Sequence, residues 1–359
     1  MGQGYKSYFL IREEGTQLGA ESATWGIDTG INSAGFYINS EAMSAANEQK
    51  FLTEIGKSGS YDRGVKRFRQ LGKKAEGNVE FNVYPETGGD KGGFGILLKH
   101  SFGNVTSGTY SGEGTYLHTF IPQDDLYAGM TSGIGEGAGT GRAWGISFHV
   151  GREDDAGTIR DYPYLGNRVK SISLSCAAGE ELKCTVNTVA RIAKSHGNAL
   201  SFTAPLVVPF MWKDATFKIE VDEFGASGTA KTIDSWNINI DNNMKEVFCL
   251  GTNVISRVVP NGQRVVTGAY SAPFTGWVRS EYGKWVNGQK SSFTMIFNSP
   301  PYRLEIKCPS IYYTGKTPNI SSLDENVIEM PFQMVSETTH YDIKMFLVNT
   351  DRQVGFVDA

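Results

Sequence analysis

The residues of this 359-residue chain best suited to bind a metal or attack a substrate are its four cysteines and five histidines. Zinc sites use Cys and His at short spacings, such as two Cys separated by two residues. No two cysteines here have that spacing, and no histidine pair forms a His-Glu-x-x-His segment. Cys176 and Cys184 could face each other across a hairpin, but free, mostly buried thiols are the expectation. The sequence therefore predicts no metal and no other cofactor.

Two acidic pairs and one glycine-rich segment could also do chemistry. Asp124-Asp125 and Asp154-Asp155 place carboxylates side by side, but neighbouring residues on a strand point to opposite faces and chelate a cation poorly. Residues 133–139 have the composition of a phosphate-binding loop, which requires a helix immediately after it. The residues that follow alternate like a strand instead. We expect surface loops at all three places, and without a catalytic motif the chain is predicted not to be an enzyme.

Composition and charge describe a folded, turn-rich protein. Hydrophobic residues make up 40% and charged residues 20%, with 43 glycines and 12% aromatics, which favours a β protein. The formal net charge is −4, whereas proteins that grip DNA through its phosphates carry a basic excess or stripe. The one basic cluster, at 66–74, is interpreted as a solvated loop or strand edge. No apolar run is long enough to cross a bilayer, and the first residues lack a secretory signal, so a cytoplasmic location is expected.

Alternation of apolar and polar residues is the main structural signal. Residues 235–241 place Trp236, Ile238 and Ile240 on one face and Asn237, Asn239 and Asp241 on the other. Residues 77–84 repeat the pattern, with Glu80 and Asn82 on the polar face. This period of two predicts strands with one buried face. Similar strands are predicted at 116–121, 144–150, 169–175, 182–189, 217–221, 264–270, 293–297, 302–307 and 327–335.

Helical signals are few. Residues 40–55 could form a helix capped by Ser40, and two shorter candidates lie between strands at 94–102 and 274–286. The order strand, short helix and further strands occurs twice along the chain. The fold class predicted is therefore mainly β, with two tandem antiparallel β-sandwich or barrel domains and a short helix flanking each. The domains are placed at 1–195, with an N-terminal arm, and 196–359, with a C-terminal arm.

Long loop insertions are concentrated in the first half. Residues 31–70 and 122–142 are rich in Gly, Ser and polar residues, and loops of this length in a compact domain are often functional. We interpret them as contact arms.

The second half contains a recognisable series of segments. It starts with VVPFMWKDA and FKIEV, continues through TIDSWNINIDNNMKEVFCLG and PNGQRVVTG, and ends with SSFTMIF, YRLEIKCP and VIEMPFQMV. This order resembles the tail tube proteins (major tail proteins) of long-tailed bacteriophages. RVKSISLSC through LKCTVNTVAR looks like a second, diverged copy. The resemblance covers most of residues 75–345, and residues 1–70 do not match it.

The resemblance implies a structural virion protein. Its subunits would form rings around a central channel, and the rings would stack into a tube that passes DNA during ejection. A chain with two copies would close a pseudo-sixfold ring with three subunits. The implied partners are other copies of the chain, with the tape-measure protein and DNA in the channel and no membrane. The protein would lie in the virion tail after assembly in the cytoplasm of the bacterial host.

The polar strand faces suit a channel wall. A strand of about nine residues spans roughly 30 Å, and over that length duplex DNA carries about 18 charges. A basic wall would bind them, whereas a neutral or acidic wall would let DNA slide. The candidate lining residues are Glu80, Asn82, Asn237, Asn239 and Asp241, with ordinary outer surface as the alternative.

Ring-to-ring contacts are expected from the loops at 31–70 and 277–290, with Trp277, Tyr282 and Trp285 as candidates. Three alternatives to a tube protein stay open. The first is another tail ring component, such as a distal-tail, baseplate or terminator protein. The second is a carbohydrate-binding β-sandwich using Trp25, Trp144 or Trp236. The third is an enzyme whose site is assembled from distant residues.

Overall fold

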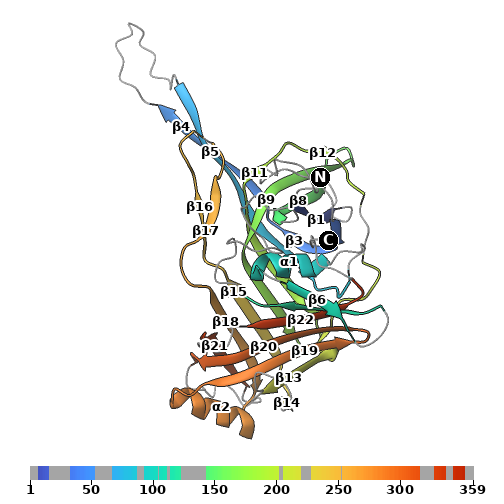
Figure 1. The fold of residues 1–359 in the computed structure, drawn as a ribbon, viewed down its shortest axis with the longest axis vertical. Helices are drawn as coiled ribbons and strands as arrows, with labels where there is room; N and C mark the ends of the chain where they lie inside the picture. The colour runs from blue at the N-terminus through green and yellow to red at the C-terminus, as the bar shows by residue number, and fades with distance from the viewer. Residues whose placement is uncertain are drawn as a thin grey trace.

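The chain is mainly β, as predicted (Figure 1). The computed structural model describes residues 7–15, 33–52, 67–86, 93–103, 105–110, 114–122, 143–201, 205–219, 228–251, 253–315, 327–336 and 343–351. These residues contain twenty-two strands, two α-helices and the 3-10 helix η2 (Trp212–Asp214). None of the helices in the described ranges is long and apolar enough to span a membrane.

The strands fall into two sets that repeat one order along the chain. The first set, called the first copy, comprises β1 (Tyr8–Gly15), β2 (Ser33–Phe36), β3 (Ile38–Glu41), β4 (Ser44–Leu52), β5 (Arg67–Asn82), β8 (Ala143–Glu153), β9 (Ile159–Ala177), β10 (Lys183–Ala190), β11 (Ile192–Ala193) and β12 (Gly197–Asn198). The second copy comprises β13 (Ala215–Ile219), β14 (Thr229–Lys231), β15 (Ser235–Asp241), β16 (Met244–Val247), β17 (Arg257–Pro260), β18 (Val265–Pro273), β19 (Ser291–Ser299), β20 (Tyr302–Tyr313), β21 (Val327–Met334) and β22 (Lys344–Asn349).

The two copies also share one pairing scheme. In the first copy, neighbouring strands follow the order β2–β1–β8–β9–β10–β5–β3. In the second copy, the order is β14–β13–β19–β20–β21–β18–β15. The N-terminal part of the long strand in each copy also pairs with the last strands of that copy, β11 and β12 on β9 and β22 on β20. The repeated element order predicted from the sequence is thus a repeat of strand pairing as well.

A hairpin and two helices complete the fold. Each copy has one helix at the same place in the order, α1 (Gly93–Phe102) after β5 and α2 (Gly276–Val286) after β18, so both short helix predictions are confirmed. The hairpin of β6 (Val105–Thr109) and β7 (Tyr116–Phe120) follows α1 and pairs with β22. It has no counterpart among the described strands of the second copy.

The third helix prediction, at residues 40–55, is wrong. Residues 38–41 and 44–52 form β3 and β4 instead, and β4 pairs with β5 from Ser44 opposite Glu76 to Leu52 opposite Arg67. Residues 53–55 lie outside the described residues. The alanines and glutamates of this segment favour helix, but only by about 0.7 kcal/mol per residue or less. Pairing along the 16-residue strand β5 overrides that preference.

One hydrogen-bonded joint unites the copies into a single sheet. The C-terminal half of β9 pairs with β10 on one side and with β15 on the other, where residues 171–177 lie opposite 241–235. The result is an eight-strand layer in the order β3–β5–β10–β9–β15–β18–β21–β20. The division into domains 1–195 and 196–359 stays a prediction, because strands from both sides of it share this layer and one hydrophobic core.

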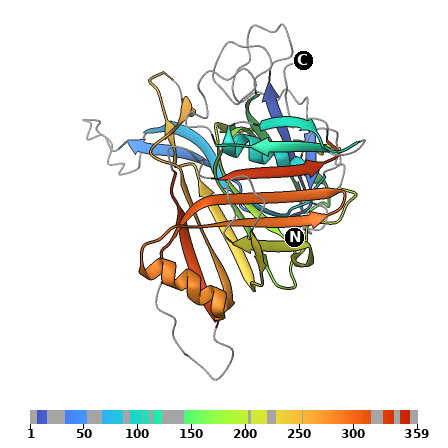
Figure 2. The same cartoon turned by 60° about the horizontal axis from the view of Figure 1, so that its bottom comes forward.

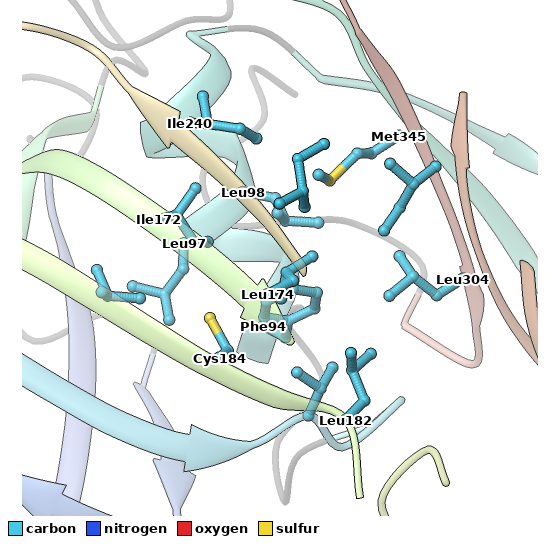
Figure 3. Close-up of a cluster of buried hydrophobic side chains, with 14 of the residues drawn as sticks. Phe94, Leu97, Leu98, Ile172, Leu174, Leu182, Cys184, Ile240, Leu304 and Met345 are labelled. Carbon is cyan, nitrogen blue, oxygen red and sulfur yellow. The ribbon is translucent and has the colours of Figure 1, made fainter. Parts of the chain in front are cut away.

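Helix α1 fills the space behind that layer. All ten of its residues are buried. Figure 3 shows Phe94 and Leu97 of α1 beside side chains of β9 and β10, whereas Leu98 lies near Met345 of the second copy. Since buried apolar area is the main source of stability, the two copies stabilise each other through this shared core.

Candidate assembly surfaces

The outer side of the eight-strand layer is a continuous polar face. The strand register places six side chains next to one another in one row across six strands: Glu80, Thr185, Ser173, Asn239, Thr267 and Gln333. The next row along the strands contains Asn82, Lys183, Ser175, Asn237, Ala269 and Pro331. A third contains Asn78, Asn187, Ser171, Asp241 and Val265, and a fourth Ala177, Ser235, Ser271 and Glu329. We call these four rows the polar face.

Most side chains of the polar face are short and uncharged, and some form hydrogen bonds with one another across strands. Ser173 donates to Asn239 Oδ1 at 2.7 Å, and Asn187 donates to Ser171 Oγ at 2.8 Å. The charged members of the four rows are Glu80, Asp241, Glu329 and Lys183. Three negative charges and one positive charge leave a net of −2. A surface of this kind holds no strong attraction for phosphates.

The five predicted lining residues lie together on this face. Glu80 and Asn82 come from β5, and Asn237, Asn239 and Asp241 from β15, three strands further along the same layer. Asn237 and Asp241 are exposed, whereas Trp236, Ile238 and Ile240 between them are buried. Alternation predicted which residues face out. It did not predict that the two halves would contribute to one surface.

Two hairpins extend beyond the layer at one end of the molecule (Figure 1). The first arm is β4 with residues 67–76 of β5, and the second arm is β16 with β17. They touch where the Lys73 amide donates to the Asn253 carbonyl at 2.7 Å. In the turn of the second arm, Phe248 is 45% exposed and Leu250 is fully exposed. The interpretation of 31–70 as a contact arm is consistent with the first arm, although 53–66 lie outside the described residues.

Helix α2 lies at the opposite end of the molecule from the arms (Figure 1), and the turned view shows it beside the ends of the strands (Figure 2). Its Val278 is buried, whereas Trp277, Tyr282 and Trp285 are partly buried and pack against the core. Trp277 stacks on the buried ring of Tyr270, with centroids 6.0 Å apart. The three aromatic side chains predicted to contact the next subunit ring thus also hold α2 on its own chain. Val286 on the same helix is 60% exposed.

Buried polar groups fix each helix to its sheet. At α1, Lys99 Nζ and His100 Nε2 lie 3.2 and 2.9 Å from Glu13 Oε1 of β1. Burial lowers the pKa of His100, although Glu13 opposes this shift. At α2, Glu281 accepts hydrogen bonds from Ser291 at 2.6 Å and Tyr313 at 2.8 Å, and Lys284 lies 2.8 Å away. A buried carboxylate with several donors is strongly anchored.

One buried pair has the geometry of a catalytic base but is closed to substrates. His149 Nδ1 lies 2.8 Å from Asp161 Oδ2, the arrangement that orients an imidazole in hydrolases. Tyr8 donates to the other Asp161 oxygen at 3.1 Å. His149 is 2% and Asp161 4% exposed. The network therefore ties β1, β8 and β9 together.

The cysteines and the acidic pairs were the other residues considered for metal binding. No cluster of three or more His, Cys, Asp or Glu there could hold a metal. Cys176, Cys184 and Cys308 are free and buried, and Cys249 is exposed. Cys184 lies opposite Leu174, not opposite Cys176. Asp154 accepts from the amides of its own turn. The 122–142 insertion, with Asp124-Asp125 and 133–139, lies outside the described residues apart from Pro122.

The aromatic residues suggested for carbohydrate binding receive no support. Trp236 is 1% exposed and packs in the core, so its suggested role as an exposed sugar platform is wrong. Trp25 and the side chain of Trp144 lie outside the described residues.

Comparison with known protein families gives a match that covers most of the chain. A family model described as phage tail tube protein matches residues 9–334. The chain belongs to the phage tail tube protein family. No curated protein matches it. A tail tube protein is a structural component of the virion tail that assembles into a multimeric tube, and the matched range runs from the beginning of β1 to the end of β21.

Sequence reasoning missed several members of the surfaces in this tail tube protein. Thr185, Ser173, Thr267 and Gln333 complete the first row of the polar face. They occupy alternate positions of strands that the sequence did predict, so the same period of two contained the signal. The exposed Phe248 and Leu250 carry no periodic signal, because a turn has none.

Proposed function

We propose that three of these chains form a ring whose eight-strand layers close into one barrel with the polar face towards the bore. The observation that carries the proposal is the repeated pairing scheme, in which one chain supplies two copies of the same unit in a single layer. Three chains would then present six copies. Contacts that repeat by rotation close into rings, and the same chains stack into tubes.

The size of such a barrel suits DNA passage. Eight strands from each chain would give twenty-four in a ring of three. At about 4.8 Å per strand, the circumference corresponds to a backbone diameter of roughly 37 Å, which strand tilt increases. Two chains would give only about 24 Å, which inward side chains would narrow further. A bore walled by Ser, Thr and Asn, with a net −2 per chain, lets the duplex slide past.

Rings would stack with the arms of one against the α2 end of the next. The arms and α2 lie at opposite ends of the molecule (Figure 1), and both ends expose apolar side chains, Leu250 on one and Val286 on the other. The tape-measure protein would occupy the bore before ejection, and DNA would follow it. Assembly would take place in the cytoplasm of the bacterial host.

Electron microscopy of the purified chain tests the proposal. Hollow tubes with threefold-symmetric rings in cross-section are expected. Single rings that never lengthen would instead indicate another tail ring component, and a monomer at high concentration would contradict any assembly role.

The two tryptophans of α2 separate stacking from folding. Trp285→Ala is expected to shorten the tubes and to lower subunit stability less than Trp277→Ala does, although Trp285 also packs against the core. Trp277→Ala is expected to weaken both, because Trp277 stacks on buried Tyr270. Tube length by microscopy and thermal unfolding of the subunit give the two readouts. Unchanged tubes from both variants would remove α2 from the proposed stacking contact.

A further inference from the structure

The pairing repeat holds residue by residue. In the first copy, register places Ile38, Phe81, Cys184 and Leu174 in one row across four strands. In the second copy, the matching row is Ile238, Gly268, Phe332 and Tyr313. Ile38 therefore corresponds to Ile238, and Leu174 to Tyr313.

The joint connects the end of one row to the start of the other. Leu174 lies opposite Ile238, with both side chains in the core. On the polar face beside them, Ser173 bonds to Asn239. The joint is thus a contact between the last strand of one copy and the first strand of the next in the layer.

The same two strand edges are open at the ends of the layer. Among the described strands, β3 pairs only with β5, and β20 beyond Ile311 pairs only with β21. An open edge exposes unpaired amides and carbonyls that recruit another strand. Tyr313 at this edge is held in place, because its hydroxyl donates to Glu281 at 2.8 Å and lies 3.0 Å from the Tyr270 hydroxyl.

We propose that β3 of one chain pairs antiparallel with residues 312–315 of a second copy, in the register of the joint. Ile38 would lie opposite Tyr313 of the neighbouring chain, on the core side. On the polar side, the bulge at Asn39 and Ser40 would lie opposite Tyr312, and the exposed Tyr37 opposite the exposed Thr314. The inference rests on the proposed ring and specifies which residues meet in it.

Cysteine cross-linking between two differently substituted chains tests the register. Both chains carry Cys249→Ser, which removes the exposed native thiol. One then carries Ser40→Cys and the other Tyr312→Cys. Facing residues on paired strands are about 4.5–5.5 Å apart, within reach of a disulfide. The expected result is a covalent dimer of unlike chains under mild oxidation.

In the matched control, the second chain carries Gln333→Cys and keeps Tyr312. Gln333 lies opposite Tyr312 on β21, one strand further from the proposed joint and about 4.8 Å more distant. Ser40→Cys with Gln333→Cys is expected to give no dimer above background. If Tyr312→Cys impairs folding, Tyr37→Cys with Thr314→Cys tests the same register through two exposed residues.

Microscopy of the unoxidised mixtures separates the possible outcomes. Tubes together with cross-linking of both facing pairs support the inference. If tubes form but neither facing pair gives more cross-linked dimer than the control, the proposed register is wrong and the tube proposal stands. Chains that form neither tubes nor cross-linked dimers overturn both.

Discussion

The Ser173 hydroxyl donates a 2.7 Å hydrogen bond to Asn239 Oδ1 across the joint of β9 and β15. The two residues are 66 positions apart and belong to different copies of the repeat. Beneath them, Leu174 and Ile238 are buried side by side in the core. One face of the joint is therefore polar and the other is packed, which is the organisation of the whole eight-strand layer.

Ile238→Ala should destabilise the chain by about 2–5 kcal/mol, because it removes buried methyl groups and leaves a cavity at the joint. Urea unfolding followed by tryptophan fluorescence measures the loss. Asn237→Ala, on the exposed side of the same strand, should change stability by less than about 0.5 kcal/mol. Equal effects from the two variants would contradict the burial assigned to β15.

Adding positive charge to the polar face should make a tube retain DNA. Asn237→Lys places a cation in the proposed bore of every chain, and each phosphate contact steepens the salt dependence of binding. Retention of duplex DNA by purified tubes is expected to rise and to fall again with added salt. Thr106→Lys adds the same charge on β6, an edge strand outside the layer, and should have no effect. Equal retention of DNA by both variants would mean that the polar face does not line the bore.

Leu250→Ser should shorten tubes without altering the fold. The Leu250 side chain is fully exposed in the turn of the second arm, so the isolated subunit does not depend on it. The proposed contact with the next ring does, since burial of apolar surface drives association. Tube length by microscopy and the melting temperature of the subunit are the readouts. Leu206→Ser, at an equally exposed leucine outside the arms, is the control and should leave tube length unchanged.

Acidification should weaken the fold through His118. Nε2 of this buried histidine donates to Asn349 Oδ1 and the Asp351 carbonyl, both at 2.9 Å, so Nδ1 accepts from Ser107. Burial lowers the pKa of His118, and these hydrogen bonds oppose the shift only in part.

Below pH of about 6.5, the unfolded chain gains a proton at His118 that the folded chain does not bind. Stability contributed by the neutral ring is therefore complete above that pH and falls as the pH drops towards the lowered pKa of the folded state. Thermal unfolding between pH 7 and pH 5 should show a smaller loss for His118→Gln than for the unchanged chain. Some loss should persist, because the pKa of buried His100 is lowered as well. Parallel profiles for the two chains would exclude this role of His118.

The positions of the layer strands other than β3 were predictable from the sequence, because each of these strands buries one face. Trp236, Ile238 and Ile240 alternate with polar residues, and this period identifies both the strand and its buried side. The two short helices were predictable for a similar reason, because each interrupts alternation between two strands. The segment 40–55 was not, because its residues favour helix while its partner strand, β5, lies far along the chain.

The shared layer was not predictable, because tertiary packing determines which strands pair and the alternation within one strand does not. Nothing in the alternation of β15 indicates that Ser173, and not a residue of the second copy, lies beside Asn239. The arms illustrate the same limit. No strand was predicted within residues 244–260, whereas register pairs Met244 with Pro260 and Val247 with Arg257 in a hairpin.

The covalent link between the two copies has a kinetic consequence for assembly. The joint of β9 with β15 forms within one molecule, so its rate does not depend on how many chains are present. In the proposed ring only every second contact between copies requires an encounter between molecules. Tethering raises the effective concentration of the linked partners into the millimolar range. Ring nucleation should then depend on a lower power of protein concentration than it would for six separate single-copy chains.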